Sequence, residues 1–141
     1  MDRKASIRKK FLNLRKRSYF EINEKFFYPL TKLIRNRYKR GLKKIYVSLY
    51  YPSLNEVNVL KITKLEFSQK LNFLLPIIEK NNSMNFFKWE KNEILFLNKF
   101  GVPEPIKTKK IVPNFILVPL LAFDKNKNRI GYGKGFYDKY L

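Results

Sequence analysis

Two successive segments near the C-terminus are Phe115-Ile-Leu-Val-Pro-Leu-Leu-Ala-Phe-Asp124 and Arg129-Ile-Gly-Tyr-Gly-Lys-Gly-Phe-Tyr-Asp138. The first is almost wholly apolar and predicts a buried strand. The second has glycines at 131, 133 and 135, which allow backbone angles closed to other residues and let a ligand approach closely. A strand, a glycine-rich turn and a helix start together are typical of phosphate binding in α/β proteins. A tight turn with solvated charges is the equally weighted alternative.

The charged groups of this second segment suit a polyanionic ligand. Successive backbone N–H groups in a glycine-rich turn can form an anion-binding nest. Arg129 and Lys134 add positive charge. Asp138 adds an oxygen ligand suited to a hard cation such as Mg²⁺.

The composition restricts the chemistry that is open to the chain. Its 141 residues are 45% hydrophobic and 16% aromatic, which predicts one folded domain over 1–141. There is no cysteine and no histidine. Disulfides, thiolate nucleophiles, Ser-His-Asp chemistry and metal sites with Cys or His ligands are therefore excluded. Any metal must be held by oxygen, and any proton transfer must use Asp, Glu, Lys, Tyr, substrate or water.

The net charge of +20 is unevenly placed, because residues 1–44 carry 16 of the 31 Lys and Arg but 3 of the 11 Asp and Glu. Such a field attracts polyanions, so a nucleic-acid-binding protein is a serious alternative. A compositional bias toward Lys, Asn, Ile and Phe would produce the same excess. The charged N-terminus lacks the apolar region of a signal peptide, and no apolar run is long enough to span a bilayer. We therefore expect a cytoplasmic protein.

Two helices are predicted in the N-terminal part. Apolar residues at helical spacing predict the first over 2–17. The capping-box spacing of Ser18 and Glu21 predicts the start of a second helix that covers a sheet. We expect Pro29 to bend this helix and Gly41 to end it.

Apolar runs bounded by turn residues predict strands over 44–50, 71–78, 84–89 and 115–122. The last run is the most apolar and is expected at the centre of the sheet. A helix is predicted over 57–67 and a loop over 98–110. This order of elements predicts an α/β layer fold.

Several residues outside the glycine-rich segment have more than one interpretation. Lys4 and Arg8 share a helical face, and Arg15 follows Arg8 by two turns, which suits a solvated basic face, an RNA-facing helix or cations aimed at a phosphate chain. Glu56 follows a predicted strand at the sheet edge where ligands gather. It is a candidate acceptor for ligand N–H groups, but the residues alone favour a helix-start carboxylate. Trp89 suits the wall of an aromatic ligand's pocket, but such a residue more often lies in the core.

Six short motifs occur in a characteristic order. They are Lys-x-x-x-Arg at 4–8, an aromatic residue and a glutamate at Tyr51 and Glu56, Met-x-Phe and a tryptophan within 84–89, Asn-x-Phe-Gly-x-Pro-Glu-Pro at 98–105, Pro-x-x-x-Phe-Asp at 119–124, and the glycine-rich segment at 129–138. Together they resemble the 5-formyltetrahydrofolate cyclo-ligase family, also called methenyltetrahydrofolate synthetases. The resemblance runs from Lys4 to Leu141, with Phe136 where the family has tyrosine. Each motif is weak alone, but the six in this order are specific.

The resemblance implies a fold and a reaction. The fold is a single-domain layered α/β sandwich of the NagB/RpiA/CoA transferase-like type, with a mostly parallel sheet flanked by helices. The reaction is the ATP-dependent conversion of 5-formyltetrahydrofolate to 5,10-methenyltetrahydrofolate with release of ADP and phosphate, with Mg²⁺ as cofactor. The resemblance further implies a monomer that requires neither nucleic acid nor a membrane. Such a reaction needs positioning and charge stabilisation more than a protein nucleophile, so His and Cys are dispensable.

Site residues follow from the resemblance, position by position. It implies ATP-binding roles for Lys4, Ala5, Ser6, Ile7, Arg8, Arg129, Ile130, Gly131, Tyr132, Gly133, Lys134, Gly135, Phe136 and Tyr137. It implies folate-binding roles for Tyr51, Glu56, Tyr132, Gly133, Lys134, Gly135 and Phe136, with Glu56 on the pterin N–H groups. Lys134 and Arg129 are the implied catalytic residues, and Asp138 is the implied Mg²⁺ ligand.

Family members continue for several dozen residues past the position of Leu141, with more helix, more sheet and a second acidic residue near Mg²⁺. The resemblance therefore implies a cyclo-ligase domain over 1–141 that is truncated at its C-terminus. Two alternatives stay open: a small basic nucleic-acid-binding protein, and a catalytically inactive truncated family member.

Overall fold

The central sheet has four strands in the order β3-β2-β1-β6. The computed structural model describes residues 3–38 and 44–141. The strands are β1 Ile45–Ser48, β2 Leu71–Ile78, β3 Met84–Trp89 and β6 Phe115–Ile116. β1 is parallel to both β2 and β6, whereas β3 is antiparallel to β2. The sheet is thus mixed with parallel strands at its centre, and the predicted α/β class is confirmed.

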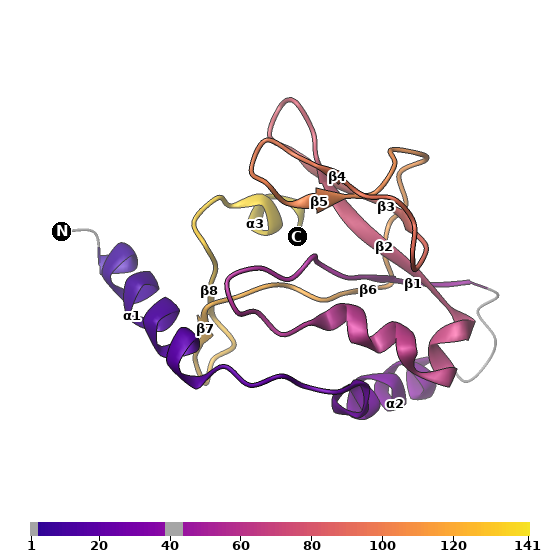
Figure 1. Ribbon diagram of the computed structural model, residues 1–141, viewed down its shortest axis with the longest axis horizontal. Coiled ribbons are helices and arrows are strands. Elements are labelled where there is room, and N and C mark those ends of the chain that lie inside the picture. The colour runs from indigo at the N-terminus through magenta and orange to yellow at the C-terminus, as the bar shows by residue number, and fades with distance from the viewer. Residues whose placement is uncertain (1–2, 39–43) are drawn as a thin grey trace.

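Helical segments surround this sheet. The helices are α1 Arg3–Ser18, α2 Tyr28–Arg37 and α3 Phe136–Tyr140, with short 3-10 helices at Glu24–Phe27, Val59–Lys64 and Glu66–Lys70. In Figure 1, α2 and the magenta 3-10 turns lie together below the sheet, α3 lies above it, and α1 stands apart at the left. Within the described ranges, no helix is long and apolar enough to cross a membrane.

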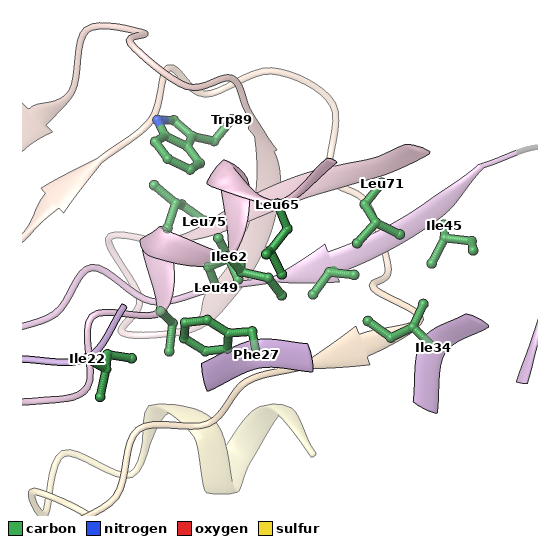
Figure 2. Packing of buried hydrophobic residues seen from close by; sticks show 12 residues of the cluster. Ile22, Phe27, Ile34, Ile45, Leu49, Ile62, Leu65, Leu71, Leu75 and Trp89 are labelled. Atoms are coloured by element: carbon green, nitrogen blue, oxygen red, sulfur yellow. The ribbon is translucent and has the colours of Figure 1, made fainter. Parts of the chain in front are cut away.

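Alternating side chains of β2 supply the core on both faces of the sheet, as the period of a strand requires. Leu71 and Leu75 belong to a cluster that also contains Ile34 of α2, Ile62 of the 3-10 turns and Trp89 (Figure 2). Leu74, on the opposite face, belongs to a smaller cluster against which α3 packs. Full burial of one large aliphatic side chain contributes about 1.5–3 kcal/mol. Because Trp89 is buried within the first of these clusters, it is a core residue, as its residue type alone suggested.

The predicted start of the second helix is wrong. α1 continues through Ser18, so this residue ends one helix instead of capping the next. Asn23 caps the 3-10 helix Glu24–Phe27, which leads directly into α2. Its Oδ1 accepts a hydrogen bond of 3.0 Å from the backbone N–H of Lys25. Pro29 lies in the first turn of α2, where its missing N–H removes no helical hydrogen bond, so it does not bend the helix. The predicted stop at Gly41 lies outside the described residues.

The expected central position of the 115–122 strand is also wrong. Only Phe115–Ile116 pairs with the sheet, and this pair lies at the sheet edge beside β1. Pro119 has no N–H to contribute to a strand ladder. The chain leaves the sheet there and forms a hairpin from β7 (Ala122–Phe123) and β8 (Arg129–Ile130). β1 and β2 occupy the centre instead.

Two further segments differ locally from expectation. The helix predicted over 57–67 is realised as 3-10 turns. The loop predicted over 98–110 contains part of a hairpin of β4 (Phe96–Leu97) and β5 (Pro103–Glu104). The Asn98 side chain holds its turn, since Oδ1 accepts from the backbone N–H groups of Phe100 at 2.8 Å and Val102 at 3.1 Å.

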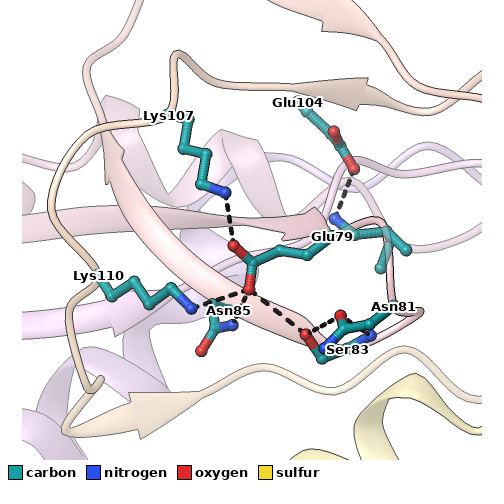
Figure 3. Close-up of polar contacts among 8 residues, drawn as sticks. Glu79, Asn81, Ser83, Asn85, Glu104, Lys107 and Lys110 are labelled. Atoms are coloured by element: carbon teal, nitrogen blue, oxygen red, sulfur yellow. Dashed lines mark hydrogen bonds and ion pairs between the residues drawn. The ribbon is translucent and has the colours of Figure 1, made fainter.

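Glu79, directly after β2, joins the β2–β3 hairpin to the segment that follows β5 (Figure 3). Its Oε1 lies 2.6 Å from Lys107 Nζ, and its Oε2 lies 2.9 Å from Lys110 Nζ and 2.6 Å from Asn85 Nδ2. The side chain is only 14% exposed. Hydrogen bonds from Lys107 and Lys110 lower the pKa of Glu79 to about 2.

We expect Glu79→Gln to lower the free energy of unfolding at neutral pH. The unfolding free energy of the variant should also vary less with pH in the acidic range. A carboxylate whose pKa is lowered by folding stabilises the protein above its unfolded pKa of about 4.5, and this stabilisation is lost as the pH falls toward about 2. The difference in unfolding free energy between parent and variant, measured by urea denaturation, should therefore shrink as the pH falls through that range. Glu90→Gln is the control, because the Lys88–Glu90 pair is well exposed. A difference that stays constant between neutral pH and pH 3 would contradict the expectation.

Candidate active site

A cavity of about 620 Å³ lies at the carboxyl ends of β1, β2 and β6. Its walls come from α1, from the segment after β1, from the β4–β5 hairpin and from Arg129–Asp138. Carboxyl ends of parallel strands are where open α/β sheets bind ligands. The fold therefore places the glycine-rich segment at a ligand-binding edge.

The Gly loop, residues 130–135, reaches its shape through left-handed backbone angles. Gly133 has φ +97° and Gly135 has φ +73°, which other residues rarely adopt. Arg8 packs against the loop, because a Cβ atom on Gly133 would lie 3.2 Å from the Arg8 guanidinium carbon. Arg8 Nε also donates a hydrogen bond of 3.0 Å to the carbonyl of Gly131. α1 and the loop thus form one side of the cavity together.

Glu56 is buried in the wall of the same cavity, with 7% of its surface exposed. Its Oε2 accepts from the backbone N–H of Ser53 at 2.8 Å and from Ser53 Oγ at 3.3 Å. Its Oε1 accepts from the hydroxyl of Tyr132 at 2.6 Å. The residue before the next 3-10 helix is Asn58, so the helix-start interpretation of Glu56 is wrong.

Three tyrosines lie around Glu56 and keep their protons at neutral pH. Burial, with the Glu56 charge as a second cause, raises the pKa of Tyr50 to about 12. Burial and the hydrogen bond to Glu56 raise the pKa of Tyr132, and burial with the Glu56 charge raises that of Tyr137. Among the described residues, the buried Tyr137 hydroxyl oxygen has no hydrogen-bond partner. Because Tyr137 lines the cavity, this hydroxyl is a candidate donor to a bound ligand.

Lys134 reaches across the cavity from the Gly loop. Its Nζ lies 5.1 Å from the ring centroid of Phe100, which lies in the β4–β5 turn. The Phe100 ring in turn packs against Phe136, with ring centroids 5.8 Å apart. Aromatic packing and a cation–π contact thus set where the ammonium group lies.

Arg129 and Asp138 form an ion pair at the start of α3, with the Asp138 side chain 72% exposed. The described part of the chain contains no cluster of three or more side chains that could enclose a metal ion. Mg²⁺ commonly needs one or two carboxylates when phosphate oxygens and water complete its shell. A single exposed carboxylate beside a cavity that suits a phosphate-bearing ligand fits that kind of site.

The cavity brings together most of the residues expected in the site. Lys4, Arg8, Tyr51, Glu56 and all of Arg129–Asp138 line it. Within the described residues, the cavity lining does not include Ala5, Ser6 or Ile7. Helical residues four apart share one face, so Lys4 and Arg8 face the cavity and the three residues between them do not. The individual roles of these residues stay predictions.

Three residues of this region were not among the site residues expected from the sequence. Arg15 contacts Tyr132 and the Leu120 carbonyl, and its spacing of seven from Arg8 was a usable signal. Phe100 was noted only as part of a motif. Tyr50 carried no signal, since a tyrosine at the end of a strand is common.

Comparisons with known proteins show which family the chain resembles in sequence and in fold. The chain is 36% identical over 99 residues to a 5-formyltetrahydrofolate cyclo-ligase of Mycoplasma genitalium, covering 67% of this chain and 50% of that protein. It is 28% identical over 102 residues to the enzyme of that name from Haemophilus influenzae, covering 67% and 54%. The solved structure of 5,10-methenyltetrahydrofolate synthetase from Aquifex aeolicus superposes with a TM-score of 0.66 at 29% identity, covering 96% of this chain and 70% of that one.

The chain spans about half the length of the curated relatives it matches. The model of the 5-formyltetrahydrofolate cyclo-ligase family matches residues 1–141, the whole of this chain. Together with the shared fold, this match shows that the chain belongs to the 5-formyltetrahydrofolate cyclo-ligase family.

Proposed function

We propose that the protein converts 5-formyltetrahydrofolate to 5,10-methenyltetrahydrofolate, with conversion of ATP to ADP and phosphate. The observation that carries the proposal is that Glu56 and Lys134 line one cavity although they belong to distant segments. Glu56 suits the N–H groups of a pterin, because a carboxylate only accepts hydrogen bonds. Lys134 and the Gly loop suit a triphosphate. Two different ligands would therefore meet in one space.

The chemistry requires two bond exchanges between these ligands. The formyl oxygen attacks the γ-phosphorus, the bond to the β-phosphate oxygen breaks, and ADP leaves. N10 of the folate then attacks the activated carbon and loses its proton, and the carbon–oxygen bond breaks to release phosphate. No protein nucleophile is needed, so a chain without His or Cys can perform both steps. Effective charge stabilisation at the transferring phosphoryl group is the main requirement.

We assign that task to two cations, Lys134 and Arg129. Lys134 extends from the Gly loop over Phe100, and Arg129 directly precedes the loop and pairs with Asp138. Lys4 and Arg8 line the α1 side and suit the remaining phosphates. The cavity is thus positive on the side where we place the triphosphate.

Mg²⁺ belongs to the proposal as a partner of the nucleotide. Asp138 would hold it through one carboxylate, and its mostly exposed side chain is accessible for this. When bound, the ion would neutralise phosphate charge. Release of Asp138 from its ion pair would leave the Arg129 guanidinium able to turn toward phosphate oxygens.

We expect Tyr137→Phe to stabilise the free protein while slowing the reaction. The substitution removes a buried hydroxyl without a partner, which should raise the unfolding free energy by about 1 kcal/mol. Loss of the hydrogen bond that this hydroxyl would give a ligand should lower turnover about tenfold. Urea denaturation and steady-state rates measure the two effects. Tyr140→Phe, in the same helix but outside the cavity, should leave turnover unchanged, and a Tyr137→Phe variant at the parent's rate would refute the role.

The direct test of the proposed function combines ATP, Mg²⁺ and 5-formyltetrahydrofolate with the protein. The expected result is growth of the near-ultraviolet absorbance of the methenyl product together with release of ADP. Omission of any one component should abolish it. Absence of product would contradict the proposal for this chain, and a raised melting midpoint with MgATP in that case would identify an inactive protein that still binds nucleotide.

We further propose that the protein is a monomer, that it acts in the cytoplasm and that it does not require nucleic acid. Activity unchanged by added RNA and a single-chain mass in solution are the expected results. RNA affinity that falls steeply with salt and does not depend on Glu56 would favour a nucleic-acid-binding role instead.

A further inference from the structure

Arg15, Tyr132 and Glu56 form a continuous polar connection, here called the Tyr132 bridge. The Tyr132 hydroxyl donates to Glu56 Oε1 at 2.6 Å and accepts from Arg15 Nη1. Arg15 Nη2 donates to the carbonyl of Leu120, which precedes β7. The three residues are far apart in sequence, with separations of 76 and 117 positions. The contacts therefore exist only through the fold.

The bridge joins the two halves of the proposed active site. Tyr132 belongs to the Gly loop, two positions before Lys134, whereas Glu56 belongs to the segment after β1, and both line the cavity. A change of loop position moves the hydroxyl that fixes one oxygen of Glu56. The other oxygen is held by Ser53. The direction of the Glu56 carboxylate thus depends on the Gly loop through a single hydroxyl group.

We propose that the Tyr132 bridge couples the two ligands, so that a nucleotide held by the Gly loop aligns Glu56 for the pterin and increases folate affinity. The inference rests on the proposed function and adds positioning roles for Tyr132 and Arg15. Neither residue needs to take part in bond exchange.

Arg15 anchors the bridge to α1. α1 has no buried side chain among its 16 residues. Arg8 fixes the helix to Gly131, and Arg15 fixes it to Leu120 and Tyr132. The burial that raises the pKa of Tyr132 keeps its hydroxyl protonated, so it donates to Glu56 and accepts from Arg15. The direction of each hydrogen bond is therefore defined.

The test measures the affinity for 5-formyltetrahydrofolate by calorimetry with and without a non-hydrolysable ATP analogue and Mg²⁺. In the parent we expect the analogue to increase folate affinity about tenfold, a common size for coupling between sites. In Tyr132→Phe and in Arg15→Gln we expect the ratio of folate affinities with and without the analogue to be near one. A residue that only supported the fold would lower both affinities without changing their ratio.

Matched controls exist for both substitutions. Tyr19→Phe removes a hydroxyl bonded to a carboxylate, Glu21, at an exposed position. Arg17→Gln removes an exposed guanidinium from the same helix. Both controls should keep the parent's ratio, and circular dichroism confirms folding. A parent ratio of one or less, or a parent-like ratio in either bridge variant, would overturn the inference while leaving the proposed function intact. A folded parent that binds no folate in either state would overturn both.

Discussion

Replacing Lys134 with alanine is expected to lower turnover about 10³-fold, the largest effect of any single substitution considered for this protein. The transferring phosphoryl group spreads negative charge over its oxygens, and a cation placed beside them stabilises the transition state more than the bound ATP. Lys134 extends from the Gly loop into the cavity and is exposed. Its removal should therefore leave the thermal midpoint unchanged. Steady-state rates with saturating substrates and a melting curve test both statements.

Two further variants sharpen the Lys134 test. Lys134→Arg keeps the charge but changes its geometry, so an intermediate rate is expected. Lys139→Ala removes an exposed lysine of α3 that does not line the described cavity, and it should behave like the parent. Equal rates for Lys134→Ala and the parent would show that another group supplies the charge. Equal losses in the two alanine variants would point to the overall positive field instead.

Replacing Glu56 with glutamine is expected to weaken 5-formyltetrahydrofolate binding about 100-fold, corresponding to about 3 kcal/mol. A carboxylate accepts two pterin N–H groups with charge assistance, whereas an amide offers one acceptor and places a donor against the second N–H. Affinity for the ATP analogue alone should change little, because the Oε1 of a glutamine side chain can still accept the hydrogen bond by which Tyr132 ties this position to the Gly loop. Separate titrations with folate and with nucleotide measure the two affinities.

Glu66→Gln provides the matched control for Glu56. Glu66 is an exposed acid at the start of the 3-10 helix Glu66–Lys70, and it does not line the cavity as described. Its replacement should change neither affinity. Parent-like folate affinity in Glu56→Gln would exclude the carboxylate as the pterin acceptor. Loss of both folate and nucleotide binding would indicate instead that the Ser53 and Tyr132 contacts of Glu56 hold the site together.

Local patterns predicted the elements whose partners are close in sequence. The hairpin strands β2 and β3 occupy the predicted ranges 71–78 and 84–89, because apolar runs and an Asn-Asn-Ser turn determine them locally. Pairing across long distances was not predictable in the same way. The apolar run at 115–122 has the composition of a central strand, yet β1 and β2 take that position and Pro119 ends the pairing.

Composition alone determined which kinds of chemistry are closed to the chain, and motif spacing alone predicted which segment would bind phosphate. The absence of His and Cys and the glycines at 131, 133 and 135 follow from the residues themselves. Tertiary structure alone decided that Tyr132 contacts both Glu56 and Arg15, because Glu56 is 76 positions and Arg15 is 117 positions away from it. A residue type specifies what a side chain can donate or accept. Only the fold decides which distant group comes within 3 Å of it, because chain closure over such distances depends on packing of the whole core.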